Sequence, residues 1–255
     1  MIHTGLVSIT FRSLSPQEIV ALVAKAGLRG IEWGGDIHVP HGDLRRAKEV
    51  YRMTTDAGLE VASYGSYYRV GCEEKESIPF EGVLDTALAL KAPVIRVWAG
   101  DRGSREADED RWTKVIDETC RIGALAKEAG ITISFEYHGN TLTDTTESAF
   151  RLMKVVGGEG ITCYWQPPVG LEDEQRIAGL RQILPWLENI HVFWWNIYER
   201  RPLVEGMDAW RKYMELIRTA QGDRFCMLEF VRDDDPNQFL KDTVTLKAIV
   251  DGPEG

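Results

Sequence analysis

Four side chains that can bind a metal ion stand in or directly after short apolar runs in the second half of the chain. They are Glu136, Gln166, His191 and Glu229. If the four runs are neighbouring strands of one parallel barrel, these side chains converge at the carboxyl-end mouth of that barrel. Oxygen and imidazole ligands without a thiolate suit Mn²⁺, Mg²⁺ or Co²⁺, with Zn²⁺ as an alternative. The pattern therefore predicts a metal-assisted enzyme.

Each of these residues also has a purely structural interpretation. A glutamate at a strand end can face solvent or pair with an arginine such as Arg96 or Arg232, and a lone histidine in a strand is often a core residue. Gln166 offers an amide oxygen without charge, so it is a poorer ligand than aspartate and could instead orient a substrate or a water molecule. Two glutamates with a histidine between them, on strands of one barrel, favour a functional site.

The elements that would position these residues alternate along the chain. Short apolar runs alternate with longer helical patterns, which indicates βα units, a parallel sheet and one (β/α)₈ TIM barrel over residues 1–255. The predicted strands lie near 3–9, 29–33, 60–64, 93–98, 131–136, 161–166, 189–195 and 225–230. The predicted helices lie near 16–26, 43–57, 80–91, 107–129, 144–156, 172–187, 208–220 and 236–250.

Capping residues support these boundaries. Ser15 and Glu18 form the pattern of a capping box, with Pro16 at the first helical position. Asp208 and Asp235 are predicted to cap the last two helices. A glycine in the left-handed conformation is expected to close three of the helices, at Gly27, Gly58 and Gly130.

Aromatic and basic residues near the strand ends are candidates to contact a substrate. Tryptophans cluster there, and a ring at a barrel mouth can stack on a sugar, although about half should pack under the helices because strands alternate in and out. These tryptophans are Trp33, Trp98, Trp165, Trp194 and Trp195. The predicted substrate-binding residues are His38, Trp98, His138, Trp195 and Arg201. His3 begins the first strand, at the opposite end of the barrel, and is predicted to be structural.

Composition limits the class of protein. The chain has 255 residues, with 30 basic and 40 acidic side chains and a net charge of −10, which repels nucleic acid and anionic membranes. It contains no apolar run of membrane-spanning length and no signal-peptide pattern, so a cytoplasmic location is expected. The cysteines follow no metal-binding spacing and are predicted to be small buried thiols. They are Cys72, Cys120, Cys163 and Cys226.

Several stretches resemble the sugar phosphate isomerase/epimerase superfamily of xylose isomerase-like TIM barrels. The similar stretches are 30–40, 95–100, 136–144, 189–192 and 227–230. Its members include ketose 3-epimerases, hydroxypyruvate isomerase, inosose dehydratases and, more distantly, endonuclease IV. The resemblance implies a metal held by Glu136, His191, Glu229 and an aspartate, and Gln166 stands at the aspartate position. It also implies that Glu136 and Glu229 are the catalytic residues, which shuttle a proton on opposite faces of an enediolate.

The predicted activity is isomerisation or epimerisation of a small unphosphorylated keto-sugar, polyol ketone or keto-acid. Asp233, Asp234 and Asp235 after the last strand would repel a phosphate, although Arg200 and Arg201 argue the other way. The alternatives are a catalytically silent sugar-binding barrel and a dehydratase or lyase of the same superfamily. Nucleic-acid chemistry of the endonuclease IV type is disfavoured by the five histidines and the negative charge. A homo-oligomer remains open.

Overall fold

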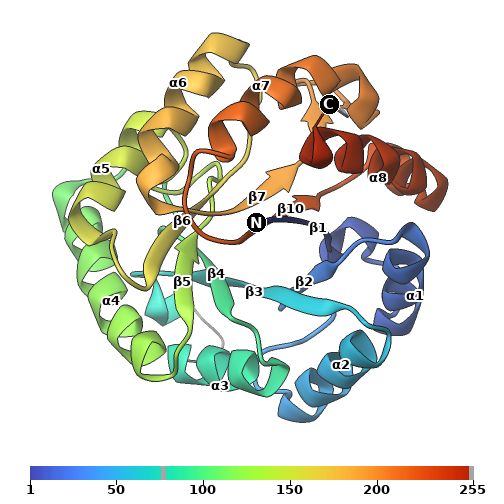
Figure 1. Ribbon diagram of the computed structural model, residues 1–255. Coiled ribbons are helices and arrows are strands. Elements are labelled where there is room, and N and C mark those ends of the chain that lie inside the picture. Colours follow the sequence, from blue (N-terminus) through green and yellow to red (C-terminus); the bar gives the residue numbers. More distant parts are fainter. Residues whose placement is uncertain (76–78, 253–255) are drawn as a thin grey trace.

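The computed structural model describes residues 1–75 and 79–252, in which eight parallel strands form a closed barrel inside a ring of eight helices (Figure 1). The barrel strands are β1 (Ile2–Val7), β2 (Gly30–Gly34), β3 (Glu60–Arg69), β4 (Val94–Trp98), β5 (Thr132–Phe135), β6 (Ile161–Trp165), β7 (Leu187–Val192) and β10 (Arg224–Leu228). The helices are α1 (Pro16–Ala26), α2 (Leu44–Asp56), α3 (Phe80–Leu90), α4 (Glu109–Glu128), α5 (Thr146–Val156), α6 (Asp173–Ile183), α7 (Met207–Ile217) and α8 (Pro236–Asp251).

The order of the strands around the barrel is β1-β10-β7-β6-β5-β4-β3-β2. The predicted (β/α)₈ fold is therefore confirmed. Strands β5, β6, β7 and β10 are consecutive neighbours, and Met227 of β10 is in register with His191 of β7. The four predicted metal ligands are thus carried by one continuous half of the barrel.

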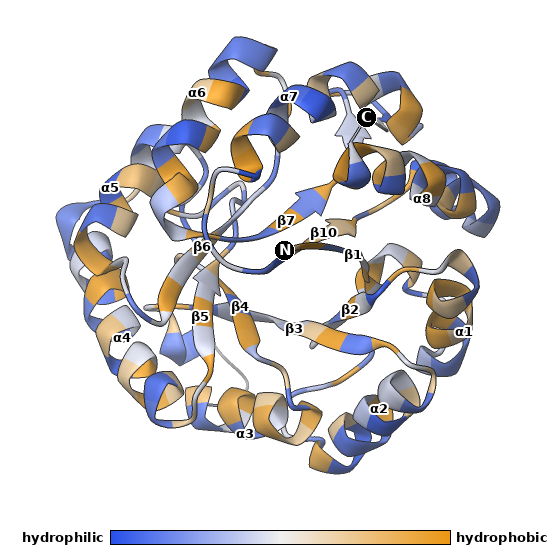
Figure 2. Ribbon diagram, viewed as in Figure 1, coloured by the Kyte–Doolittle hydropathy of each residue, from blue (hydrophilic) through white to orange (hydrophobic). Residues whose placement is uncertain are grey.

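The helices cover the barrel with one apolar face each. In α1 the residues Ile19, Val20, Val23 and Ala26 are buried, and Figure 2 shows apolar and polar residues side by side on the helices. The capping box at Ser15 is present, with the Ser15 hydroxyl accepting from the Glu18 amide. Gly27, Gly58 and Gly130 all have the predicted left-handed backbone, with φ of 63°, 74° and 71°.

One predicted cap is wrong. Asp235 caps α8 as expected, accepting from the Asn237 amide. Asp208, however, lies in the first turn of α7, because a short 3₁₀ helix, η4 (Leu203–Gly206), runs directly into this helix. Gly206 therefore takes the N-cap position, without a side-chain cap. The other 3₁₀ helices of the described residues are η1 (Ser8–Phe11), η2 (Glu73–Lys75), η3 (Leu184–Trp186) and η5 (Arg232–Asp234).

Two strands differ most from their predicted extents. Strand β3 continues to Arg69, five residues beyond the predicted end, through an irregularity in its pairing with β4. The segment predicted as one strand over 189–195 is interrupted at Phe193. Its end forms β8 (Trp194–Trp195), which pairs antiparallel with β9 (Arg200–Arg201) outside the barrel. The Trp210 indole fixes this break by donating to the Phe193 carbonyl at 2.9 Å.

The tryptophans divide between the two faces of the barrel wall, as predicted. Trp33 is fully buried under α2 and donates to Thr54, and Trp165 packs against Trp210 and Tyr213 of α7. Three of the cysteines are buried free thiols, whereas Cys120 is exposed on α4, contrary to the prediction, because it lies on the outer face of that helix. Among the described residues, no helix is both long enough and apolar enough to cross a membrane.

Candidate metal centre and active-site pocket

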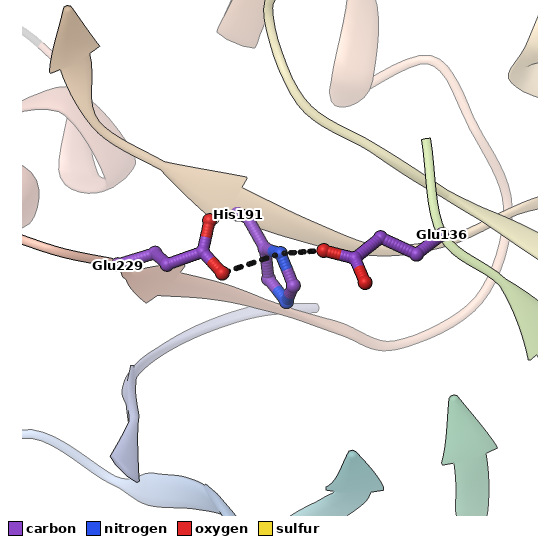
Figure 3. Close-up of side chains that lie close together, drawn as sticks. All are labelled: Glu136, His191 and Glu229. Carbon is purple, nitrogen blue, oxygen red and sulfur yellow. Dashed lines mark ion pairs between the residues drawn. The ribbon is translucent and has the colours of Figure 1, made fainter. Parts of the chain in front are cut away.

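An imidazole between two carboxylates occupies the barrel interior (Figure 3). His191 projects from β7 and is completely buried. Its Nδ1 lies 3.4 Å from Glu136 Oε1 and 3.5 Å from Glu229 Oε1. One ligand atom from each of these three residues lies within 4.8 Å of the others, an arrangement that could hold a metal ion.

Gln166 joins the same cluster. Its Oε1 lies 3.0 Å from His191 Nδ1, and its Nε2 donates to the Tyr137 carbonyl at 2.8 Å. Because only the NH₂ end can donate to a carbonyl, the Tyr137 contact fixes the amide with its oxygen toward His191. The structure therefore brings together all four residues that were predicted as metal ligands.

This donor set fits a hard divalent cation. Ligands about 2.1 Å from an octahedrally coordinated ion are separated by about 3 Å, close to the spacing around His191 Nδ1. Two carboxylates, an amide oxygen and an imidazole suit Mg²⁺, Mn²⁺ or Co²⁺, and Zn²⁺ also accepts these atoms. The unusual member is Gln166, which supplies an oxygen without a negative charge.

Two charged residues that the sequence prediction did not place in the site complete it. Arg96 of β4 is 1% exposed, and its Nε donates to Glu32 Oε1 at 2.8 Å. Its Nη1 bonds Glu136 Oε2, which also accepts from the Trp98 indole at 2.5 Å. The arginine pairing considered as an alternative role for Glu136 therefore coexists with the cluster. The signal for both residues was a charged side chain inside a short apolar run, Val94–Trp98 for Arg96 and Gly30–Gly34 for Glu32.

The two glutamates of the cluster differ in acidity. Burial favours the neutral form of Glu136, but Arg96 and then His191 outweigh it and lower its pKa to about 2. Burial raises the pKa of Glu229 to about 7, against the opposing effect of His191. Burial favours neutral His191, yet Glu229 and Glu32 raise its pKa to about 10. A divalent cation among these groups would instead favour ionised glutamates and a neutral imidazole.

A pocket of about 250 Å³ opens above the cluster at the carboxyl ends of the strands. It is lined by Ile9, Arg12, Tyr67, Arg96, Trp98, Glu136, His138, Gln166, Trp195, Glu229 and Phe230. Three of the predicted substrate-binding residues, Trp98, His138 and Trp195, therefore belong to the wall. Trp98 and His138 stack with ring centroids 4.3 Å apart.

The other two predicted substrate-binding residues lie away from this pocket. His38 is 2% exposed and bonds within the protein: Nε2 donates to the Leu14 carbonyl at 3.2 Å and Nδ1 accepts from the Ser8 hydroxyl at 3.0 Å. Arg201 lies in β9, beside a separate surface depression, and pairs with Glu205. His38 was misplaced because the turn after β2 folds inward and buries it beside Trp33.

Tyr67 is a pocket residue with no signal in the sequence. Its φ is +59°, which is rare for a side chain with a Cβ and places it in a strained backbone region. Its ring lies under the Arg96 guanidinium at 4.8 Å and meets the edge of Trp98 at 5.1 Å. Its buried hydroxyl has no hydrogen-bond partner among the described residues. Strain of this kind is more common at functional sites than elsewhere.

Comparison with known proteins agrees with this architecture. A family model described as the xylose isomerase-like TIM barrel matches residues 20–247. A 3-dehydroshikimate dehydratase of Bacillus anthracis is 24% identical over 202 residues, which cover 73% of this chain and 70% of that protein. The crystal structure of a probable 3-dehydroshikimate dehydratase involved in petrobactin synthesis, from the same organism, superposes with a TM-score of 0.77 at 19% identity, covering 99% of this chain and 100% of that one. The structure of D-psicose 3-epimerase in the presence of D-fructose superposes with a TM-score of 0.72 at 15% identity, covering 98% and 100%.

Proposed function

The chain belongs to the xylose isomerase-like TIM-barrel family, and from this premise we propose that it is an enzyme that removes a proton next to the carbonyl group of a small, unphosphorylated, hydroxylated ketone. The observation that carries the proposal is the convergence of Glu136 and Glu229 on His191 beneath a pocket of about 250 Å³. A pocket of that size suits a monosaccharide, a cyclic polyol ketone or a keto-acid. The net charge of −10 disfavours a nucleic-acid substrate.

The four clustered residues would supply a cation to this reaction. A divalent ion held by Glu136, Gln166, His191 and Glu229 would stabilise the negative charge that develops on the carbonyl oxygen as the proton leaves. Mn²⁺, Co²⁺ and Mg²⁺ suit the ligands best, with Zn²⁺ as an alternative.

The residues that can move the proton are unequal. Glu136 is held by two donors on Oε2, Arg96 and Trp98, so it is a weak base. Without a cation, burial raises the pKa of Glu229 to about 7, so its carboxylate is a stronger base than that of Glu136, and a bound cation would lower the pKa of both. His138 offers a second group. Its Nδ1 lies 2.7 Å from the Gly139 carbonyl and must donate there, which leaves Nε2 as the basic nitrogen.

This inequality supports dehydration over epimerisation within the proposed class. Epimerisation requires proton removal from one face of the carbon and return to the other, for which Glu136 and Glu229 would have to be comparable bases. Dehydration requires one base that removes the proton from the α-carbon of the ketone. It also requires one acid that protonates the hydroxyl group on the β-carbon, which leaves as water. Glu229 and His138 can fill these roles between them. The similarity to a 3-dehydroshikimate dehydratase supports the same choice.

Solvent exchange tests the class before the substrate is known. The protein is incubated with Mn²⁺ and a panel of ketoses, polyol ketones and keto-acids in D₂O. Deuterium on the carbon next to the carbonyl is the expected result, and dehydration adds the ultraviolet absorbance of an unsaturated ketone. Glu229→Gln should abolish exchange, whereas His3→Ala, at the opposite end of the barrel, should leave it intact. A protein that binds metal but exchanges no member of a broad panel would favour the alternative of a catalytically silent sugar-binding barrel.

A further inference from the structure

Glu32 is a buried carboxylate that reaches the candidate metal centre from the opposite side of the barrel. It projects from β2, is fully buried, and is absent from the pocket lining given above, so its contacts are with protein groups. An isolated buried carboxylate costs several kcal/mol unless it is paired and hydrogen-bonded. The three groups that contact Glu32, namely Ser63, Arg96 and His191, therefore indicate the role of this buried charge.

Each oxygen of Glu32 has a defined environment. Oε2 accepts from the Ser63 hydroxyl at 2.7 Å. Oε1 accepts from Arg96 Nε at 2.8 Å and lies 3.4 Å from His191 Nε2. One carboxylate oxygen thus faces both the guanidinium that holds Glu136 and the imidazole that stands between Glu136 and Glu229.

The two nitrogens of His191 have different surroundings. Nδ1 faces the oxygens of Glu136, Gln166 and Glu229, while Nε2 is buried without a hydrogen-bond partner among the described residues. A small rotation of the ring would shorten the 3.4 Å contact with Glu32 into a hydrogen bond. A histidine that binds a metal through one nitrogen usually donates the other N–H to a carboxylate or carbonyl, which fixes its tautomer and orientation.

The β3 strand makes room for this arrangement at Gly65. A Cβ at this position would lie 2.7 Å from Arg96 Nη2 and 3.0 Å from Glu32 Oε1. The ion pair therefore depends on a residue without a side chain at this point of the barrel wall.

We propose that Glu32 is a positioning residue of the candidate metal centre, which orients His191 through Nε2 and Arg96 through Nε so that His191 Nδ1 and Glu136 Oε1 face a common point. This inference rests on the proposed function only in taking the cluster to bind a divalent cation. The competing role is a structural ion pair in which Glu32 does no more than neutralise Arg96.

Glu32→Gln separates the two roles, because it keeps the size of the side chain and the Ser63 contact but removes the charge. The matched control is Glu118→Gln, since Glu118 is also a buried carboxylate, 7% exposed and bonded to Arg121 and Tyr68, but it lies on α4 away from the cluster. Calorimetric titration with Mn²⁺ should show a 10- to 100-fold loss of affinity in Glu32→Gln and none in Glu118→Gln. If Glu32→Gln is poorly folded, Glu32→Asp can replace it. The shorter side chain keeps the charge but moves it away from His191, so this variant should show the same loss of Mn²⁺ affinity.

A second measurement follows His191 itself. The ¹⁵N spectra of the imidazoles in the metal-free protein, assigned by comparison with His191→Gln, should show a proton on His191 Nε2 in the wild type and a lower occupancy of that proton in Glu32→Gln. Folded Glu32 variants that bind Mn²⁺ within twofold of the wild type, with an unchanged His191 spectrum, would overturn the proposal. If the wild type binds no divalent cation, the metal part of the proposed function fails. The role of Glu32 is then tested by the His191 spectra of the metal-free wild type and metal-free Glu32→Gln. If the two spectra are the same, Glu32 does not orient His191 and the proposal is overturned.

Discussion

Gln166 and His191 are hydrogen-bonded between neighbouring strands, Oε1 to Nδ1 at 3.0 Å, and the amide is held in this orientation by its second contact, from Nε2 to the Tyr137 carbonyl. The glutamine therefore presents an oxygen to the cluster and cannot turn its NH₂ group there without losing the Tyr137 contact. An aspartate at this position would add a third carboxylate. Compared with an aspartate, Gln166 therefore changes the charge of the site and not its shape.

The first prediction concerns this missing charge. We expect the wild type to bind Mn²⁺ or Co²⁺ at one site, and Gln166→Asp to tighten that binding at least about tenfold, roughly 1.4 kcal/mol, because a carboxylate attracts a divalent cation more strongly than an amide does. Calorimetry and the metal-induced rise in melting temperature measure it. Gln182→Asp, an exposed residue of α6 with the same change of charge, is the control. Glu229→Gln should lose the site, and an unchanged affinity in Gln166→Asp would mean that Gln166 is not a ligand.

The second prediction is that a sugar phosphate is not preferred over its parent sugar. The two arginines that could favour a phosphate are engaged with acids: Arg200 bonds Asp234 at 2.6 Å and Arg201 lies 3.0 Å from Glu205. A panel of phosphorylated and free substrates, compared by kcat/KM or by deuterium exchange, tests this expectation. Asp234→Asn should shift the ratio toward the phosphate by freeing Arg200, whereas Asp208→Asn should not. A clear preference of the wild type for the phosphorylated compound would contradict the prediction.

The architecture and the convergence of the cluster could be predicted from local patterns. Each strand carries its own apolar run, and Glu136, Gln166 and Glu229 directly follow theirs, so barrel closure alone brings them together. The ion pair of Glu32 and Arg96 could not be predicted in this way, because it joins β2 to β4 across the barrel interior and its room comes from Gly65 on a third strand. The position of His38 depends on the turn after β2, and that of Tyr67 on the irregular backbone near the end of β3, and neither feature leaves a periodic signal in the sequence.

The third prediction concerns the stability of the fold at mildly acidic pH. Burial lowers the pKa of His38, against the opposing effects of the Leu14 carbonyl and Asp36. In the unfolded chain a histidine takes up a proton below about pH 6.5, whereas folded His38 stays neutral to lower pH. In this window the unfolded state binds a proton that folded His38 does not, so the contribution of His38 to the free energy of unfolding should fall as the pH falls below about 6.5 and be constant above it.

Urea unfolding at a series of pH values measures this dependence. His38→Gln should remove this contribution, leaving those of other groups with shifted pKa values, among them His3 and His41, whose pKa burial lowers, and Glu229, whose pKa burial raises. The same variant should retain wild-type affinity for Mn²⁺, because His38 does not line the pocket. If the stability of His38→Gln falls with pH as steeply as that of the wild type, His38 is not the source of the pH dependence.

The fourth prediction is that Gly65→Ala is destabilising although it adds only one methyl group. The new Cβ would lie 2.7 Å from Arg96 Nη2, closer than carbon can approach, and 3.0 Å from Glu32 Oε1, a very tight contact, so the buried ion pair must shift. Overpacking of a rigid interior costs about 1–3 kcal/mol, and denaturant unfolding should show a loss of this size. Gly158→Ala is the control, because a Cβ there meets no atom within 4 Å. If the clash with the guanidinium is the cause, the same substitution should cost less in an Arg96→Met background, and the difference is the coupling between the two positions. A Gly65→Ala variant as stable as Gly158→Ala would show that the barrel interior adapts easily, and that the position of Arg96 beside Glu136 is not fixed by packing.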